Sequence, residues 1–578
     1  MSDGVWFDRT PLLDQLRRKT EGFRSGYRQN VALLGEEGIG KSALLRRLTE
    51  GFSTGHPDFL PVYLELDESD NLVEWVTRFM QTLLYGALQV RGCDPLPTQW
   101  TGLLESCASW SPRVAHSAQR ILDGADGGKS DQAYQQCWDL LPMISNDLGC
   151  RVLIILDEFH RLRCLPVTDP FRVLGGKVMV QNSTMFLMAS SQIDAAQSIL
   201  REGLALLFGQ FEVVGMQPLS SGTCLREIQS AWTSSRREPF YDYFLAELGQ
   251  GYPDHLQRLA HGVRRQLSEN PTMDAEEVVL RVMESLLWSP SAVFRARFES
   301  RLRSLPEQRN RLACIHLLVA VAQGKCRIPQ MVEATGRKST QVARFLKVLE
   351  QSRCVQRDGA FYRVPDRLFQ LWLIAAYPAI TGVGRADVRQ GKVYFRQEAL
   401  RWIRRSGEEF RQPLVQRVER CLRSWNGEQL QFEGQRFLLP ALKQIEIRSL
   451  RGGGDAVLTT KGLGQAKRGW RIVLRMVDLS ETQARQMAEE VSSLPGARTD
   501  RKVLIVLRPV EVNARLVLQQ AKFKIWDLEF LNHLFELYGM TRIPDDEQGN
   551  PSGEMVPVDA PSTPFGSAAA QRGTEAAG

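Results

Sequence analysis

Gly35-Glu36-Glu37-Gly38-Ile39-Gly40-Lys41-Ser42 lies between an apolar run that ends at Leu34 and a helix-forming segment that begins at Ala43. The stretch matches the pattern G-x-x-x-x-G-K-[S/T] and has the strand–loop–helix context that this pattern requires. Glycine lets the backbone curl so that successive N–H groups converge on one anion, and the dipole of the following helix adds positive potential there. The sequence therefore predicts that residues 35–43 bind the phosphates of ATP or ADP. In this prediction Lys41 reaches the β- and γ-phosphates and Ser42 ligates Mg²⁺.

A second apolar run, Val152–Leu156, ends in two carboxylates, Asp157 and Glu158. A continuously apolar strand is typical of a parallel sheet that is buried on both faces, and such sheets bind ligands at the carboxyl ends of their strands. We therefore expect Asp157 beside the phosphate loop, where it would hold Mg²⁺ directly or through water. Glu158 is suited to polarise the attacking water, so Glu158 and Lys41 are the predicted catalytic residues.

Two further segments are expected to approach this site. The apolar run 185–189 is followed by Ser190 and Ser191, whose hydroxyls are suited to contact the γ-phosphate or the attacking water. Capping of the following helix is the alternative role for both serines. Residues 249–257 predict a helix that begins near Pro253 and points its N-terminus at the phosphates, although a plain helix boundary has the same pattern.

Composition restricts the class of protein. The chain has 578 residues, of which 43% are hydrophobic and 24% are charged. No apolar run approaches the roughly 20 residues that span a bilayer, so we expect a cytoplasmic protein without a membrane segment. The ten cysteines are scattered singly, which argues against zinc sites and disulfides. The formal net charge of +7 favours an anionic partner.

The positive excess is concentrated in residues 307–378, which contain twelve Lys or Arg against five Asp or Glu. Helical patterns at 315–322, 328–335 and 339–350 precede a hairpin that should turn at Asp358-Gly359, and this order predicts a winged helix. The side chains expected to contact DNA are Arg337, Lys338, Gln341, Arg344, Lys347 and Arg357. A basic, solvated face on a domain that binds protein or packs within its own chain is the alternative.

A second α/β pattern follows in residues 430–540. Strands are expected at 437–448, 454–460, 469–477 and 503–507, with a helix at 481–494. Residues 541–578 are rich in Gly, Pro, Ser and Ala, and we expect them to be disordered.

Several of these features together resemble the archaeal-type ATPase family of the STAND and AAA+ P-loop group. The features, in chain order over residues 5–378, are Phe7-Asp8-Arg9, the phosphate loop, Leu156-Asp157-Glu158, Ser190-Ser191, Gly251-Tyr252-Pro253 and the segment 362–372. The resemblance implies a multidomain α/β protein with a P-loop AAA-like parallel sheet core (1–215), a helical lid (216–303), a winged helix (304–378) and a helical connector (379–429). It also implies that ATP turnover switches the arrangement of these parts.

Members of this family often end in a domain similar to PD-(D/E)XK nucleases, and residues 430–540 resemble such a restriction-endonuclease-like α/β domain. These nucleases need an Asp on one strand and an acid-x-Lys on the next to hold Mg²⁺. Asp455 fits the first position, whereas Leu474 and Met476 occupy the other two. We therefore expect a cleavage-inactive domain that binds nucleic acid or protein. Relatives often carry Arg at the position of Gln210, which disfavours an arginine finger there; Arg201 is a candidate for this role.

The sequence thus predicts a switch that binds and hydrolyses ATP and engages DNA through its winged helix. The alternative is a signalling or scaffold ATPase whose winged helix and terminal domain bind protein partners. An active Mg²⁺ nuclease powered by ATP is a third interpretation. A nucleotide-dependent homo-oligomer is compatible with the first two.

Overall fold

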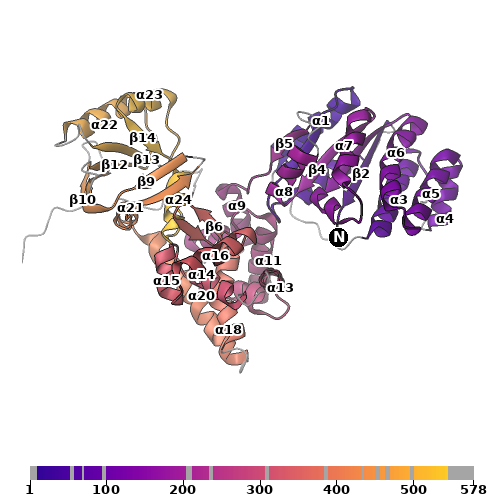
Figure 1. Cartoon of the computed structure of the whole chain (residues 1–578). Coiled ribbons are helices and arrows are strands. Elements are labelled where there is room, and N and C mark those ends of the chain that lie inside the picture. The colour runs from indigo at the N-terminus through magenta and orange to yellow at the C-terminus, as the bar shows by residue number, and fades with distance from the viewer. Residues whose placement is uncertain are drawn as a thin grey trace, which may run out of the picture. The chain divides into compact units, whose positions relative to one another are not determined.

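The computed structural model describes residues 9–52, 58–67, 71–93, 99–203, 211–232, 238–305, 311–382, 388–432, 435–449, 456–462, 469–494 and 500–544. Its contacts divide the chain into two compact units, whose elements are labelled in Figure 1. The first unit comprises Met1–Ala231 and Gly249–Arg264, and the second comprises Trp232–Leu248 and Arg265–Gly578. The finer division into six parts stays a prediction.

A five-stranded parallel sheet forms the centre of the first unit, with the strand order β2-β3-β4-β1-β5. The strands are β1 (Asn30–Leu34), β2 (Phe59–Glu65), β3 (Arg151–Asp157), β4 (Thr184–Ser190) and β5 (Phe211–Gly215). Every residue of β1 and β4 is buried, as a strand that is covered on both faces requires. The predicted parallel sheet core is therefore confirmed.

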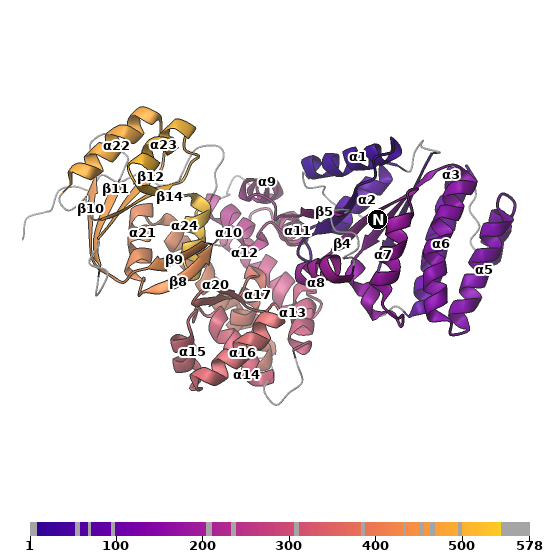
Figure 2. The same ribbon diagram turned by 45° about the horizontal axis from the view of Figure 1, so that its top comes forward.

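Helices cover both faces of this sheet (Figure 2). Alternate residues of β3 enter two separate apolar layers, because successive side chains of a strand point to opposite faces. Leu153 and Ile155 pack with α1 and α2, whereas Ile154 and Leu156 pack with α3 and α5–α7. The helices are α1 (Thr10–Arg24), α2 (Lys41–Glu50), α3 (Leu72–Val90), α4 (Trp100–Ala108), α5 (Pro112–Asp126), α6 (Ser130–Leu148), α7 (Pro170–Val180), α8 (Ile193–Ser198) and α9 (Ser221–Ala231).

The second unit begins with helices and contains the basic segment. The three expected helices and the hairpin occur as elements: α14 (Arg311–Ala322), α15 (Ile328–Thr335), α16 (Ser339–Gln351), β6 (Gln356–Asp358) and β7 (Phe361–Arg363). The three helices pack on one another, but their classification as a winged helix stays a prediction. The neighbouring helices are α10 (Pro239–Gly249), α12 (Ala275–Met283), α13 (Val293–Arg303), α17 (Arg367–Leu371), α18 (Tyr377–Thr381), α20 (Val388–Arg411) and α21 (Leu414–Arg423).

A mixed sheet with the order β10-β11-β12-β13-β14 ends the described chain. Its pairs are antiparallel from β10 to β12 and parallel from β12 to β14. Its strands are β10 (Leu442–Ser449), β11 (Ala456–Gly462), β12 (Trp470–Arg475), β13 (Arg501–Val506) and β14 (Phe523–Trp526), and its helices are α22 (Glu481–Ser493), α23 (Val512–Gln520) and α24 (Leu528–Leu537). The nuclease-like classification of this domain stays a prediction.

The strand predicted at 437–448 is wrong, because two strands occupy this stretch. β9 (Gln435–Leu439) ends just before Pro440 and pairs with β8 (Glu428–Phe432), whereas β10 belongs to the mixed sheet. Proline has no backbone N–H to donate to a ladder, so Pro440 ends the first strand and lets the chain change sheets.

The expected disorder of 541–578 is also wrong for its first residues. The backbone N–H of Thr541 donates to a Glu409 carboxylate oxygen at 2.9 Å, and the Tyr243 hydroxyl donates to the carbonyl of Arg542 at 2.6 Å. Specific side chains therefore hold this segment, although its composition favours disorder. Residues 545–578 lie outside the described part of the chain.

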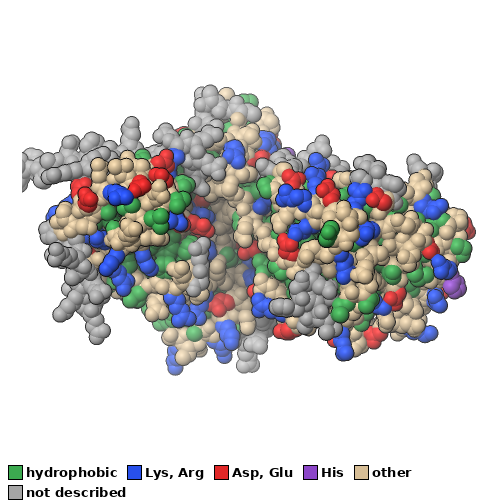
Figure 3. Space-filling model, turned by 90° about the horizontal axis from the view of Figure 1, so that it is seen from above, with side chains coloured by type: hydrophobic (Ala, Val, Ile, Leu, Met, Phe, Trp, Pro, Cys, Tyr) green, Lys and Arg blue, Asp and Glu red, His purple; other side chains and the backbone are tan. Residues whose placement is uncertain are grey.

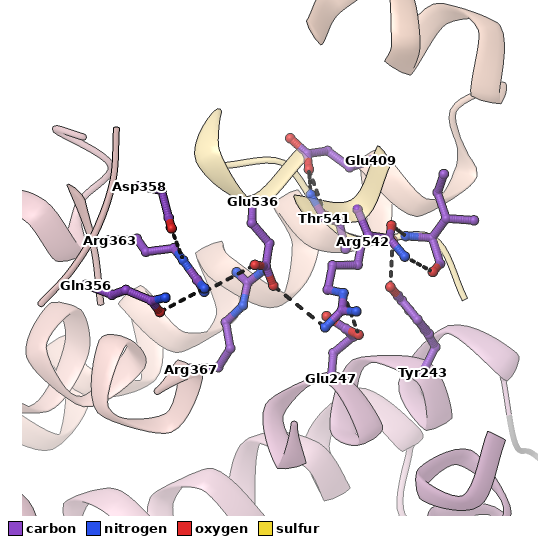
Figure 4. A network of polar contacts seen from close by, with 12 residues as sticks. Tyr243, Glu247, Gln356, Asp358, Arg363, Arg367, Glu409, Glu536, Thr541 and Arg542 are labelled. Carbon is purple, nitrogen blue, oxygen red and sulfur yellow. Dashed lines mark hydrogen bonds and ion pairs between the residues drawn. The ribbon is translucent and has the colours of Figure 1, made fainter. Parts of the chain in front are cut away.

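An ion network joins sequence-distant elements of the second unit (Figure 4). Glu536 on α24 lies 3.2 Å from Arg363, 3.7 Å from Arg367 and 3.7 Å from Arg542. Arg542 also lies 3.9 Å from Glu247 on α10. Burial disfavours the charged form of Glu536, but the three guanidinium groups hold its pKa below the ordinary value.

Charged side chains are spread over the surface. Figure 3 shows Lys and Arg beside Asp and Glu on the face that it draws. Among the described helices, none is long and apolar enough to span a membrane. The ten cysteines are unbridged, and the described residues contain no cluster of His, Cys, Asp and Glu arranged to hold a metal ion.

Candidate nucleotide-binding site

The predicted phosphate loop connects β1 to α2. Gly38 and Gly40 have φ values of +79° and +98°, a left-handed conformation that glycine adopts without steric cost. The backbone N–H of Gly35 donates to the carbonyl of Ser190 at 3.3 Å, which ties the start of the loop to the end of β4. Within the loop Gly35, Ile39 and Lys41 are buried, Gly38, Gly40 and Ser42 are half-buried, and Glu36, Glu37 and Ala43 are exposed.

Lys41 folds back over this loop, with only 4% of its side chain exposed. Its ammonium donates to the carbonyls of Gly35 at 2.9 Å and Glu36 at 3.0 Å. Its Nζ also lies 3.7 Å from Oε1 of Glu158. Burial lowers the pKa of Lys41, while the carboxylates of Glu158 and Asp157 oppose this shift. The fold thus brings together the lysine and the acidic strand end that the sequence pairs.

Asp157 ends β3 and is fully buried. Its Oδ2 accepts a hydrogen bond from the Tyr63 hydroxyl at 2.7 Å, and its Oδ1 accepts from the backbone N–H of Glu158 at 3.1 Å. Burial and the neighbouring Asp157 raise the pKa of Tyr63, so the phenol stays protonated and remains a donor. Tyr63 orients the carboxylate predicted to bind the metal, and no sequence pattern marked it.

Glu158 adopts φ 57° and ψ 41°, a left-handed conformation that costs a residue with a side chain about 1–2 kcal/mol. Its Oε2 accepts hydrogen bonds from the backbone N–H and the hydroxyl of Ser191, both at 2.8 Å. The surrounding contacts therefore hold a strained residue with its carboxylate between Ser191 and Lys41.

Ser190 and Ser191 lie where predicted, at the end of β4. Their alternative role as caps of α8 is wrong, because Gln192 is the N-cap of α8 and no side chain caps it. Ser190 Oγ instead lies 2.8 Å from Nδ1 of the buried His160. His160 was not predicted to belong to the site, although its place three residues after Asp157 was a signal that could have identified it.

The start of α11 (Pro253–Glu269) also reaches the loop. Pro253 is its first residue, and a Cβ atom added to Gly40 would lie 3.4 Å from Cγ of Pro253. The hydroxyl of Tyr252 donates to the Glu36 carboxylate. Arg9, in the opening segment, donates to the carbonyl of Ile39 at 3.5 Å. Two sequence-distant segments, residues 252–253 and Arg9, therefore lie against the phosphate loop.

The residues predicted to contact DNA belong to the second unit. Gln341, Arg344 and Lys347 are exposed on α16, and so is Lys338, which precedes this helix, whereas Arg337 is half-buried beside Phe345. Arg357 is exposed on β6. Their contact with DNA stays a prediction.

The structure describes some of the positions expected for an arginine finger and for a nuclease site. Arg201 is exposed in the turn Ile199–Gly203. Leu474 is buried in β12 opposite Ala456, and Met476 follows that strand. Gln210 and Asp455 lie outside the described residues.

The residues present fit a Mg²⁺–nucleotide. Phosphate groups would meet loop N–H groups, the Lys41 ammonium and the N-terminus of α2. Ser42 and Asp157 offer oxygen ligands, which Mg²⁺ prefers.

One part of the chain is similar to a known protein family. Residues 24–186 match the model of a family described as AAA domain. A search of curated protein sequences finds no match.

Among solved structures, the Walker-type ATPase of Pyrococcus abyssi has 14% identity and a TM-score of 0.43, over 64% of this chain and 96% of that one. The ORC2 protein of Aeropyrum pernix has 15% identity and a TM-score of 0.41, over 67% of this chain and 98% of that one. The Aeropyrum pernix ORC1 protein in complex with DNA has 15% identity and a TM-score of 0.36, over 67% and 97%. Residues 24–186, which carry the phosphate loop and the Asp157-Glu158 strand end, thus match an AAA domain.

Proposed function

We propose that this protein is an ATP-dependent molecular switch that binds and hydrolyses Mg²⁺–ATP in its first unit. The observation that carries the proposal is the convergence of Lys41 and Glu158 beside the phosphate loop, with 3.7 Å between Nζ and Oε1. A lysine beside a loop of this type binds phosphates, and a carboxylate next to it is suited to polarise water. The sequence match of residues 24–186 to an AAA domain supports the same function.

Each residue has a distinct proposed task. Lys41 exchanges the carbonyls of Gly35 and Glu36 for β- and γ-phosphate oxygens, because a charged acceptor forms the stronger hydrogen bond. Ser42 and Asp157 hold Mg²⁺, which neutralises charge on the phosphate oxygens. Glu158 accepts a hydrogen bond from the water that attacks the γ-phosphate. Ser191 holds Glu158, and the start of α11 senses whether the loop is filled.

The switch part of the proposal rests on α11. This helix starts against the loop at Pro253 and continues into Arg265–Glu269, residues that belong to the second unit. Since a helix is stiff over this length, a displacement of Pro253 by the γ-phosphate would move its far end. The γ-phosphate would then act as a signal and not as a group handed to another molecule.

The test is nucleotide binding and turnover by Lys41→Ala. We expect ATP affinity and hydrolysis to fall together, because the ammonium contacts the phosphates in the bound and reacting states. Lys129→Ala is the matched control, since Lys129 is an exposed lysine of the same unit. Wild-type ATP turnover in Lys41→Ala would refute the assignment.

We further propose that α16 contacts DNA phosphates. Arg344 and Lys347 are exposed on α16, whereas Phe345 and Leu349 of the same helix are buried. Lys338 is exposed at the N-cap of this helix. A basic helix face after two packed helices favours phosphate contacts and supplies no reading of base sequence.

A specific observation favours the scaffold alternative for the hairpin. The backbone N–H of Ala360 donates to the carbonyl of Gln429 on β8 at 2.9 Å, and a Cβ atom on Gly359 would lie 2.2 Å from the same carbonyl oxygen. The turn of this hairpin is therefore covered by its own chain. In this second candidate function the basic segment serves internal packing and protein contacts.

Salt-dependent DNA binding separates the two candidates. We expect the Arg344→Ala, Lys347→Ala variant to bind DNA more weakly and to show a smaller slope of log affinity against log salt, by about one unit per lost phosphate contact. The Arg113→Ala, Arg120→Ala variant removes the same charge from exposed positions on α5 of the first unit and should bind as the wild type does. Absence of binding at low salt would leave the scaffold function.

A further inference from the structure

We propose that His160, together with Ser190, is a positioning residue that fixes the orientation of the Glu158 carboxylate. The pair holds one oxygen of this carboxylate so that the other faces Lys41. The inference rests on the proposed ATPase function. It assigns a role to a histidine that belongs neither to the phosphate loop nor to the predicted metal ligands.

The two oxygens of Glu158 have different surroundings. Oε2 accepts two hydrogen bonds from Ser191 at 2.8 Å and lies 3.3 Å from Nδ1 of His160. Oε1 lies 3.7 Å from the ammonium of Lys41. Three donors around Oε2 occupy its lone pairs, so Oε1 is the oxygen that can accept a proton from water at the phosphate loop.

The hydrogen bonds around Ser190 determine which nitrogen of His160 carries the proton. Ser190 Oγ accepts the backbone N–H of Gln192 at 3.1 Å and can donate to the carbonyl of Gln192 at 3.4 Å. A protonated Nδ1 then donates to Ser190 Oγ at 2.8 Å and approaches Oε2 of Glu158 as a second acceptor. An unprotonated Nδ1 would instead face the carboxylate with its lone pair. The network therefore assigns the Nδ1–H tautomer.

Burial of the surrounding residues restricts the movement of His160 and Ser190 beside Glu158. Ser190 is fully buried at the end of β4, and His160 is 3% exposed in the 3₁₀ turn Phe159–Cys164. Glu158 precedes this turn in a left-handed conformation. The contacts of Oε2 with Ser191 and His160 therefore hold the side chain of Glu158 in one orientation. Water competes poorly with buried donors, which strengthens the arrangement.

Loss of the anchor should reduce turnover without weakening nucleotide binding. A shift of about 1 Å in a catalytic group can cost a factor of 10² in rate. We therefore expect His160→Ala to lower kcat by roughly 10- to 100-fold and to leave the Kd of a fluorescent ATP analogue within about twofold. Removal of a residue that contacts the γ-phosphate would, in contrast, also lower the affinity for ATP relative to the affinity for ADP.

The decisive experiment is a double-mutant cycle on the full chain. Steady-state kcat and KM are measured for His160→Ala and Ser190→Ala, each alone and combined with Glu158→Gln. We expect both single variants to lower kcat and neither to lower it further beside Glu158→Gln. His160→Asn should recover most of the rate, because its side-chain N–H₂ group can replace Nδ1–H. His116→Ala, which removes an exposed histidine from α5, is the matched control.

Two sets of results would overturn this assignment in different ways. If ATP turnover requires Glu158 but His160→Ala multiplies the loss caused by Glu158→Gln, or if His160→Asn is as slow as His160→Ala, the positioning role is refuted alone. If the wild type does not hydrolyse ATP, or if its hydrolysis survives Glu158→Gln, the proposed function fails and the inference fails with it. Ser190→Ala decides the question if His160→Ala does not fold.

Discussion

Asp157 is a buried carboxylate that two hydrogen bonds orient. Since Tyr63 donates to Oδ2 and the backbone of Glu158 donates to Oδ1, neither oxygen is left to rotate. Groups that orient a metal ligand commonly contribute 10- to 100-fold to metal affinity. The dependence of the proposed reaction on the Mg²⁺ concentration should therefore be sensitive to the hydrogen bond from Tyr63 to Asp157.

Tyr63→Phe removes the hydrogen bond and keeps the ring. We expect the Mg²⁺ concentration for half-maximal ATP hydrolysis to rise about 10-fold, with little change in the rate at saturating Mg²⁺. Tyr27→Phe, at a position that is 81% exposed, should behave as the wild type does. An unchanged Mg²⁺ requirement in Tyr63→Phe would contradict the role of this phenol.

At the scale of elements, the hairpin β6–β7 needs a glycine at position 359 for two reasons, its backbone conformation and the lack of space for a side chain. Gly359 has φ +64°, and its Cβ position is filled by the backbone of Gln429 and Leu430. Gly336, at the end of α15, has the same φ but open space around its Cβ position. A comparison of alanine substitutions at these two glycines therefore distinguishes the cost of backbone strain from the cost of a steric clash.

Gly336→Ala should destabilise the second unit by about 1–2 kcal/mol, the cost of a left-handed alanine. Gly359→Ala should cost a further ~2 kcal/mol, because backbone atoms on β8 cannot move aside cheaply. Urea unfolding followed by tryptophan fluorescence measures both free energies. Equal destabilisation by the two substitutions would show that β8 does not cover the hairpin in solution.

The elements that the sequence predicted well are those with a local signal. β1 and the phosphate loop were predictable because an apolar run, glycines at fixed spacing and a helix start lie within 20 residues. The prediction of one strand at 437–448 is wrong because it follows the apolar residues on both sides of Pro440 and ignores that a proline interrupts a strand. The contacts of Ser191 with Glu158 and of Tyr63 with Asp157 join residues 33 and 94 positions apart, and the sequence alone does not pair them.

Across the second unit as a whole, the ion network on Glu536 holds together α10, α17, α24 and the hairpin. Its members span residues 247–542, so their assembly depends on the completed fold. Glu536 is 12% exposed and faces three guanidinium groups. Removing its charge leaves those groups without their shared counterion.

Glu536→Gln should lower the free energy of unfolding by about 3 kcal/mol at neutral pH. Glu489→Gln, at an exposed position on α22 of the same unit, is the control and should change stability little. Because the folded-state pKa of Glu536 is depressed, its contribution is present above the unfolded value of 4.5 and is lost as the pH falls through the folded value. The difference between wild type and Glu536→Gln in thermal unfolding should therefore shrink below pH 4.5 and remain constant above it.

The central claim for the whole molecule is that the first unit hydrolyses ATP with Glu158 as the residue that activates water. The most direct measurement compares ATP turnover by the full-length wild type, Glu158→Gln and Glu50→Gln, with nucleotide binding measured on the same preparations. Glu50 is an exposed glutamate on α2, so its substitution makes the same chemical change away from the site. We expect Mg²⁺-dependent turnover in the wild type and in Glu50→Gln, and at least 100-fold slower turnover with retained ATP binding in Glu158→Gln. Turnover at the wild-type rate in Glu158→Gln, or no turnover in the wild type, would contradict the account.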